Sequence, residues 1–148
     1  MTGVDHIGIA VEKLEDALPF WRDQLGLELV VIEEVPSEKV RVAFLRAGST
    51  RIELLEPTSP DSPIAKALAK RGPGIHHVAL EVDDIVARMA ALKAAGRPAM
   101  DEKPRPGAEG CMVTFLHPKT AGGVLVELTQ PPPGGARHLS PPIGGAQD

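Results

Sequence analysis

The sequence contains a single cysteine, Cys111, which excludes an internal disulfide and agrees with a reducing compartment. It lacks any apolar run long enough to cross a membrane as a helix. Positive net charge is also missing, since the formal charge is −4, and this argues against a nucleic-acid binder. Because repeated sequence begins at Asp5, we expect no signal or transit peptide, and therefore a cytoplasmic protein with neither nucleic acid nor a membrane as its partner.

The composition fits one soluble domain followed by a tail. The chain has 148 residues, of which 43 % are hydrophobic and 24 % are charged, an ordinary balance for a globular protein with a sizeable core. After Pro131 the composition changes to Pro, Gly, Ala and Ser with few large apolar residues. We therefore expect residues 132–148 to be a disordered Pro/Gly-rich tail, and we assign it no function.

One motif occurs twice in the chain. Residues 5–11 (DHIGIAV) return as residues 76–82 (HHVALEV), and residues 51–57 (RIELLEP) return as residues 125–131 (LVELTQP). The offset is 71 residues for the histidines (77 − 6) and 74 residues for the glutamates (127 − 53), so three residues of insertion separate the copies. A twofold repeat of polar residues predicts a site that is shared between two similar halves.

Hydrophobic periodicity divides the first half into a strand, a helix and three further strands. Leu14, Leu18, Trp21 and Leu25 recur at helical spacing, and Gly26 is a suitable C-terminal stop for that helix. Turn residues delimit the strands that follow. The predicted strands lie at residues 5–11, 27–33, 39–46 and 50–56.

The second half repeats this order after a bridging helix. Ser62 is a typical helix cap and Pro63 suits the first helical position, which predicts a helix over residues 64–70. Asp84 then caps a further helix, which Gly96 ends. The other predicted features are a strand with His77, Ala79 and Glu81 on one face, the helical stripe Ile85, Met89 and Leu92, and strands near residues 97–101, 110–116 and 123–129.

Four polar residues occupy matched places in the two copies: His6, Glu53, His77 and Glu127. Strand alternation puts each of the two histidines on the face opposite its apolar neighbours. An ionised carboxylate in an apolar strand is costly unless it is paired or bound to a cation, and both glutamates lie in such strands. Because two imidazoles and two carboxylates suit a divalent ion, the pattern predicts a shared metal site.

Each of these residues also has an ordinary structural interpretation. A histidine on a strand is usually a hydrogen-bonded structural residue or an exposed one, and an alternating strand often turns its polar face to water. His76 lies on the same face as Val78 and Leu80, and we interpret it as structural. The matched placement in both copies is what favours the metal site.

Several segments are longer and more specific than the spacing of His and Glu. They are residues 5–11 (DHIGIAV), 61–66 (DSPIAK), 74–79 (GIHHVA), 101–108 (DEKPRPGA), 115–119 (FLHPK) and 122–128 (GGVLVEL). Over about residues 4–130 they resemble the methylmalonyl-CoA epimerase family. The resemblance implies an α+β chain whose two tandem βαβββ modules form a curved mixed sheet around a metal site, the vicinal oxygen chelate fold. The implied domain, 1–131, consists of module one at 4–60, a linker helix at 61–72 and module two at 73–131.

The resemblance also implies an activity, the epimerisation of (2R)- and (2S)-methylmalonyl-CoA through an enolate with the help of a metal. It makes His6, His77 and Glu127 metal ligands. Glu53 falls where the family has its remaining protein ligand. Inversion needs a base on each side of the planar intermediate, and we assign Glu127 and Glu53 to these roles. Some members carry another catalytic glutamate at the position aligned with Val42, where valine cannot move protons.

The expected cofactor is one divalent metal ion, and the ligand types do not distinguish Co, Mn, Ni, Zn or Mg. The expected partner is methylmalonyl-CoA, whose phosphates need local positive charge on an acidic protein. The basic residues in the family-like loops are Lys103, Arg105, Lys119 and His117, which are otherwise solvated surface groups. By analogy with other paired modules of this superfamily, we expect a homodimer.

Two other functions stay open on the sequence alone. Glyoxalase I (lactoylglutathione lyase) shares the fold and an identical set of His, Glu, His and Glu, so only the loop segments favour the epimerase. Non-catalytic members of the superfamily bind small-molecule drugs without a catalytic metal. The four ligand-type residues argue against that second class.

Overall fold

The computed structural model describes residues 3–134. Their contacts divide them into two compact units, one made of residues 6–76 and the other of residues 3–5 and 77–134. The boundaries fall inside the strands 3–10 and 74–81, each of which is described below with the unit that holds most of it. The tail predicted at 132–148 lies outside the described residues from position 135 onward. None of the helices in the described part combines the length and the apolar character needed to span a bilayer.

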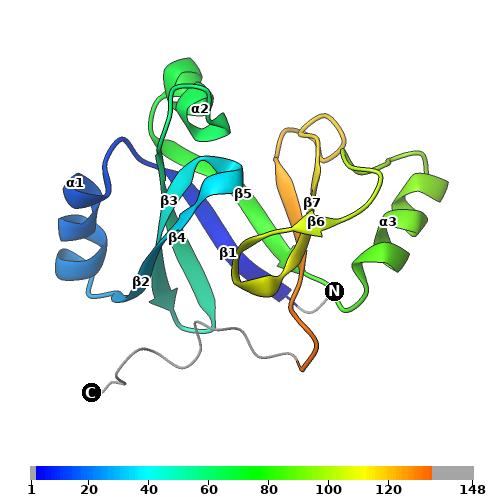
Figure 1. The fold of residues 1–148 in the computed structure, drawn as a ribbon, viewed down its shortest axis with the longest axis horizontal. Helices are drawn as coiled ribbons and strands as arrows, with labels where there is room; N and C mark the ends of the chain where they lie inside the picture. The colour runs from blue at the N-terminus through cyan, green and yellow to red at the C-terminus, as the bar shows by residue number, and fades with distance from the viewer. Residues whose placement is uncertain (1–2, 135–148) are drawn as a thin grey trace. The chain divides into compact units, whose positions relative to one another are not determined.

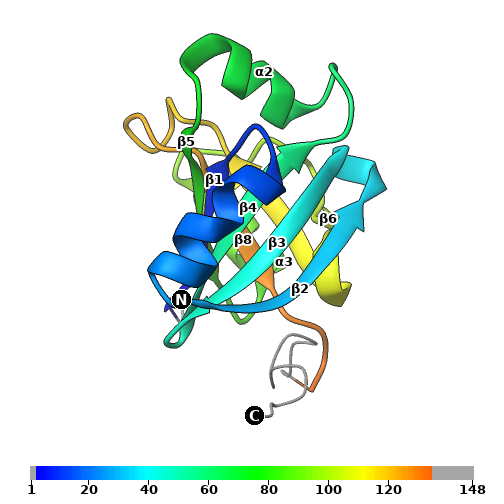
Figure 2. The same cartoon turned by 90° about the vertical axis from the view of Figure 1, so that its left-hand side faces the viewer.

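The first unit has the order strand, helix and three strands, followed by the bridging helix. Its strands lie side by side in the order β2-β3-β4-β1, with β4 parallel to β1 and the other neighbours antiparallel (Figures 1 and 2). Its elements are β1 (Gly3–Ala10), α1 (Leu14–Leu18), η1 (Pro19–Gln24), β2 (Glu28–Val35), η2 (Pro36–Glu38), β3 (Val40–Ala47), β4 (Thr50–Pro57) and α2 (Pro63–Arg71).

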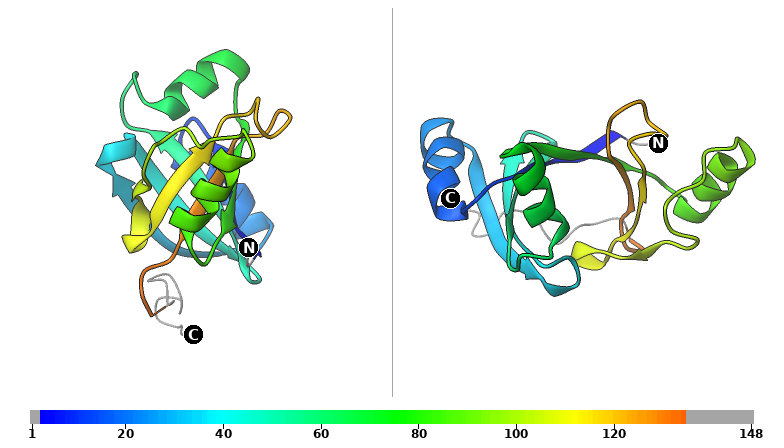
Figure 3. Two further views of the ribbon diagram at one scale, coloured as in Figure 1. Left: turned by 90° about the vertical axis from the view of Figure 1, so that its right-hand side faces the viewer. Right: turned by 90° about the horizontal axis from the view of Figure 1, so that it is seen from above.

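The second unit repeats the βαβββ order. Its strands have the order β5-β8-β7-β6, again with one parallel neighbour pair, β5 and β8. The left view of Figure 3 shows α3 lying along β7 and β8. The elements are β5 (Gly74–Glu81), α3 (Ile85–Ala94), β6 (Arg105–Pro106), η3 (Ala108–Gly110), β7 (Met112–Leu116) and β8 (Val126–Gln130).

Each unit buries one face of its sheet under its first helix. Full burial of a leucine or isoleucine side chain contributes about 1.5–3 kcal/mol, so these two clusters make a large contribution to the stability of the units. The buried cluster of the first unit is Val11, Leu14, Leu18, Ala43, Leu45 and Leu54, and that of the second is Val82, Ile85, Met89 and Leu128. The polar residues at the alternate strand positions therefore lie on the opposite face of each sheet.

The two helices that cover the sheets are capped in the same way, by a side chain from the end of the last strand. The Leu14 N–H donates to Glu56 Oε1 at 2.9 Å, and the Ile85 N–H donates to Gln130 Oε1 at 2.7 Å. These contacts satisfy N–H groups that the first turn of a helix leaves without an internal partner. The repeat therefore extends from the sequence to the way each helix is attached to its sheet.

Two of the predicted helix caps are confirmed. Ser62 Oγ accepts from the N–H of Ala65 at 2.9 Å, and α2 starts at Pro63. Asp84 Oδ1 accepts from the N–H of Ala87 at 3.0 Å.

The helix predicted from Leu14 to Leu25 is regular only as far as Leu18. Pro19 has no N–H to donate, and the chain from Pro19 to Gln24 winds as a π-helix, with the Leu25 N–H bonded to Phe20 O at 2.8 Å. The wider turn rotates the later residues off the predicted stripe. Leu25 is consequently 52 % exposed instead of buried.

The strand predicted near residues 97–101 is wrong. Pro98 cannot donate a ladder hydrogen bond, and in this stretch the Met100 N–H bonds to Phe115 O at 2.9 Å without forming a strand. The edge of the sheet is formed instead by β6, which pairs antiparallel with β7.

Candidate metal centre and active site

His6 and Glu53 form a buried pair in the first unit. In the parallel pairing of β1 with β4, Glu53 lies opposite Gly8, and His6 is two residues before Gly8 on the same face. His6 Nδ1 is 3.2 Å from Glu53 Oε2. Both residues are buried, at 5 % and 7 % exposure. Strand register and alternation are therefore sufficient to bring these two side chains together.

His77 and Glu127 form the corresponding pair in the second unit. Here Glu127 lies opposite Ala79 in the pairing of β5 with β8, and His77 is two residues before Ala79. His77 Nε2 is 3.1 Å from Glu127 Oε1, and both residues are buried. The strand register is the same as in the first unit, whereas the histidine nitrogen that faces the glutamate differs, Nδ1 in His6 and Nε2 in His77.

The donor set of each pair fits a metal ion of borderline character. A buried imidazole and a buried carboxylate offer one nitrogen and one oxygen at close range, the donors that Zn, Co, Mn and Ni accept in proteins. Burial of a carboxylate is costly without a compensating positive group. In each pair, the carboxylate is therefore suited to bind a cation as well as to contact the imidazole.

A phenylalanine lies beside the glutamate in each unit. Phe44 of β3 is the register partner of Glu53, and Phe115 of β7 is the register partner of Glu127. The ring of Phe115 packs edge-on against the ring of His77, with the centroids 5.9 Å apart. Each pair therefore has an aromatic side chain as a neighbour on the next strand.

Arg51 belongs to the same side-chain group, although the sequence analysis did not select it. It is largely buried, and its Nη2 lies 3.4 Å from Glu53 Oε2. Its position two residues before Glu53 in β4 puts it on the same face, and this spacing was the available signal.

The structure also shows on which strand faces Val42 and His76 lie. Val42 is buried in β3, two residues before Phe44, so it shares the face of Phe44 and of Glu53. A valine at this place contributes packing and no proton transfer. His76 is half-buried whereas His77 is buried, as alternation along β5 requires.

The basic residues proposed for CoA binding differ in how firmly they are held. Arg105 is only partly exposed, with its Nε 3.3 Å from Asp101 Oδ2 and its guanidinium 5.5 Å from the centroid of Phe115. Lys103, Lys119 and His117 are exposed, and His117 Nδ1 accepts from the Lys119 N–H at 3.0 Å. Arg105 is therefore the least exposed of these four residues.

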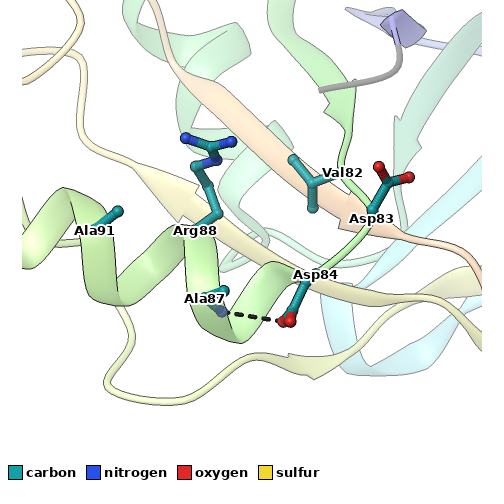
Figure 4. Close-up of a pocket in the computed structure, with 6 residues that line it drawn as sticks. All are labelled: Val82, Asp83, Asp84, Ala87, Arg88 and Ala91. Atoms are coloured by element: carbon teal, nitrogen blue, oxygen red, sulfur yellow. Dashed lines mark hydrogen bonds between the residues drawn. The ribbon is translucent and has the colours of Figure 1, made fainter.

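A pocket of about 270 Å³ lies beside the start of α3 and contains none of the candidate ligands (Figure 4). The carboxylate of Asp84 at its rim is already bonded to the N–H of Ala87. Its mixed acidic and basic lining gives a phosphate no net attraction. The lining residues are Val82, Asp83, Asp84, Ala87, Arg88 and Ala91.

Comparison with known proteins identifies the family. The family model described as the Glyoxalase/Bleomycin resistance protein/Dioxygenase superfamily matches residues 5–115. The chain is 43 % identical to the mitochondrial methylmalonyl-CoA epimerase of Mus musculus over 128 residues, which cover 86 % of this chain and 72 % of that one. It is 43 % identical over 129 residues to the ethylmalonyl-CoA/methylmalonyl-CoA epimerase of Cereibacter sphaeroides, covering 86 % and 96 % of the two chains.

Among solved structures, a variant of the Streptomyces coelicolor methylmalonyl-CoA epimerase in complex with 2-nitronate-propionyl-CoA matches with a TM-score of 0.85. It is 38 % identical, and the match covers 89 % of this chain and 99 % of that one. The predicted fold class, with two βαβββ modules, is confirmed by this match and by the family model. This chain belongs to the methylmalonyl-CoA epimerase family of the glyoxalase superfamily.

Proposed function

We propose that the protein is an epimerase that interconverts (2R)- and (2S)-methylmalonyl-CoA by removing the proton at carbon 2 and returning it to the opposite face. The observation that carries the proposal is the buried pair of histidine and glutamate that occurs in both units with the same strand register. Names of relatives support the substrate, since the Mus musculus and Cereibacter sphaeroides proteins are both methylmalonyl-CoA epimerases.

The proposed cofactor is one divalent metal ion held by His6, Glu53, His77 and Glu127. The chemistry of the donors supports this set, because each unit offers one imidazole nitrogen and one carboxylate. Such an ion supplies positive charge beside the oxygens of the thioester and carboxylate, which gain electron density when the proton leaves carbon 2.

Glu127 and Glu53 are the proposed bases. One accepts the proton from carbon 2 and the other donates a proton to the opposite face of the planar intermediate. Their origin in two copies of one motif supports an arrangement on opposite sides of the substrate. Val42 supplies no carboxylate at the position where some family members have one, and Glu53 is our proposal for the second base.

The ligand of the Streptomyces coelicolor epimerase is consistent with this chemistry. A nitronate is planar at the carbon that bears it, as carbon 2 of methylmalonyl-CoA becomes when it loses its proton. For the anionic parts of the substrate we propose Arg105 as a contact, with the exposed Lys103, Lys119 and His117 as further candidates.

The test is an incubation of the protein with single epimers of methylmalonyl-CoA in deuterated water. We expect interconversion of the epimers together with incorporation of deuterium at carbon 2. A parallel incubation with the hemithioacetal of methylglyoxal and glutathione tests glyoxalase I. Isomerisation of that adduct without turnover of methylmalonyl-CoA would overturn the proposal, and binding without turnover of either compound would indicate a non-catalytic protein.

The domain boundaries at residues 60 and 72, the cytoplasmic location and the homodimer stay predictions of the sequence. Size-exclusion chromatography with light scattering measures the last of these directly.

A further inference from the structure

Arg51 is held tightly between an aromatic ring and a carboxylate. Its side chain is 11 % exposed, and its Nη2 lies 3.4 Å from Glu53 Oε2. Its Cζ lies 5.3 Å from the centroid of Phe44, a residue that is 1 % exposed. A buried guanidinium is costly unless charge and ring contacts offset its loss of water, so this pair is not an ordinary solvated surface ion pair.

The guanidinium contacts the same oxygen of Glu53 that faces His6. Glu53 Oε2 is 3.2 Å from His6 Nδ1 and 3.4 Å from Arg51 Nη2. A cation bound by Glu53 must therefore share the negative charge of this carboxylate with Arg51. Because like charges repel, a positive charge at Arg51 disfavours the binding of a cation to the same carboxylate.

The second unit lacks an arginine at the corresponding place. The position 74 residues after Arg51, the offset that relates Glu53 to Glu127, is occupied by Leu125. Both units have a histidine, a glutamate and a phenylalanine at matching strand positions. Only the first unit has an arginine two residues before the glutamate on the same strand. The second unit also has an arginine over its phenylalanine, since Arg105 Cζ lies 5.5 Å from the centroid of Phe115, but this arginine comes from β6 and not from the strand of the glutamate.

We propose that Arg51 is a positioning residue for Glu53. It holds one carboxylate oxygen in place and competes with the metal ion for its charge. Glu53 is thereby bound less firmly by the ion and is free to exchange a proton with the substrate, while its own charge stays compensated. This inference rests on the proposed function, in which Glu53 is both a ligand and a base.

The experiment titrates metal-free protein with Mn²⁺ by calorimetry and compares Arg51→Met with Arg51→Lys. Removal of the positive charge in Arg51→Met is expected to tighten Mn²⁺ binding about threefold to tenfold. Arg51→Lys keeps the charge, and its affinity should stay within about twofold of the original protein. The matched control is Arg41→Met, which removes an arginine paired with Glu56 at 3.3 Å in the same unit and should leave the affinity unchanged.

Epimerisation is measured on the same variants at saturating Mn²⁺. In Arg51→Met, kcat should fall about tenfold or more with little change in KM, because the position of the base is affected and not the binding of substrate. Arg51→Lys should recover part of kcat. If Arg51→Met fails to fold, Arg51→Gln removes the same charge and is expected to tighten Mn²⁺ binding in the same way.

Unchanged or weaker Mn²⁺ binding in the folded neutral variants would overturn the inference, and so would an equal effect in Arg41→Met. The calorimetric comparison is independent of turnover. A wild-type protein that binds Mn²⁺ but leaves methylmalonyl-CoA unchanged would therefore overturn the proposed function, whereas the role of Arg51 toward Glu53 would still be decided by the affinities.

Discussion

His77 Nε2 lies 3.1 Å from Glu127 Oε1, and both side chains are buried. The pair is formed by strand register, since Glu127 lies opposite Ala79, two residues after His77. An unpaired carboxylate would be costly at such a place, whereas a carboxylate beside an imidazole is ready to bind a cation. The same arrangement at His6 and Glu53 makes metal binding the first property to measure.

Purified protein is expected to bind about one divalent ion per chain, because the proposed site uses the two pairs as the four protein ligands of one ion. Elemental analysis after dialysis measures the stoichiometry. Treatment with a chelator should abolish epimerisation, and added Mn²⁺ or Co²⁺ should restore it. Full activity in protein shown to be free of metal would contradict this prediction.

His77→Ala and His76→Ala should have different effects, although the two residues are adjacent. Alternation along β5 puts the buried His77 beside Glu127 and turns the half-buried His76 the other way. We expect His77→Ala to lose metal binding by about tenfold to a hundredfold or more. His76→Ala should retain metal and change mainly the free energy of unfolding. Equal loss of metal in both variants, measured by calorimetry, would contradict the assignment of faces.

Much of this site could be predicted from the sequence, because it depends on strand alternation. The repeat places His6 and His77 at one end of each unit and Glu53 and Glu127 at the other, and parallel pairing of the first and last strands brings them together. A period of two residues then decides which side chains share a face. Such a site follows from pattern and register without any knowledge of side-chain conformation.

Features that depend on contacts distant in sequence could not be predicted in this way. The ion pair of Arg51 with Glu53 depends on side-chain conformations and on the ring of Phe44. The helix caps come from Glu56 and Gln130, more than 40 residues from the N–H groups they accept from. The helix predicted from Leu14 to Leu25 was wrong after Leu18 for a local reason, because a π-helix begins at Pro19.

Glu56→Ala should destabilise the protein by about 1–2 kcal/mol, because it leaves the Leu14 N–H without its acceptor and also removes the pair with Arg41. Urea unfolding measures the change in free energy. Glu15→Ala is a suitable control, since Glu15 lies exposed on α1 and its loss should change stability by less than about 0.5 kcal/mol. Similar values for the two variants would show that the cap is not stabilising.

Stability should depend on pH through Asp61. Its hydrogen bond with Lys39, supported by one from Ser59, lowers the pKa of Asp61 from 3.8 to about 2. A carboxylate whose pKa is depressed in the folded state stabilises the protein above its unfolded pKa, and that contribution disappears as the pH falls toward the folded value. The melting temperature of Asp61→Asn should thus be lower than that of the original protein at neutral pH.

The difference in melting temperature should shrink as the pH falls from 3.8 to 2. In a Lys39→Met background it should be smaller at every pH, because the main cause of the pKa shift is gone. A difference that stays constant between neutral pH and pH 2 would contradict the linkage.

The most direct test of the account measures solvent-deuterium exchange on separate (2R) and (2S) epimers with Glu53→Gln and Glu127→Gln at saturating metal. Glutamine keeps a ligand oxygen and loses the ability to carry a proton. We expect epimerisation to fall steeply in both variants, while each still exchanges the proton of one epimer, with opposite preference in the two. Near-normal epimerisation by Glu53→Gln with metal bound would contradict it, because Glu53 would then be a replaceable ligand and not a base.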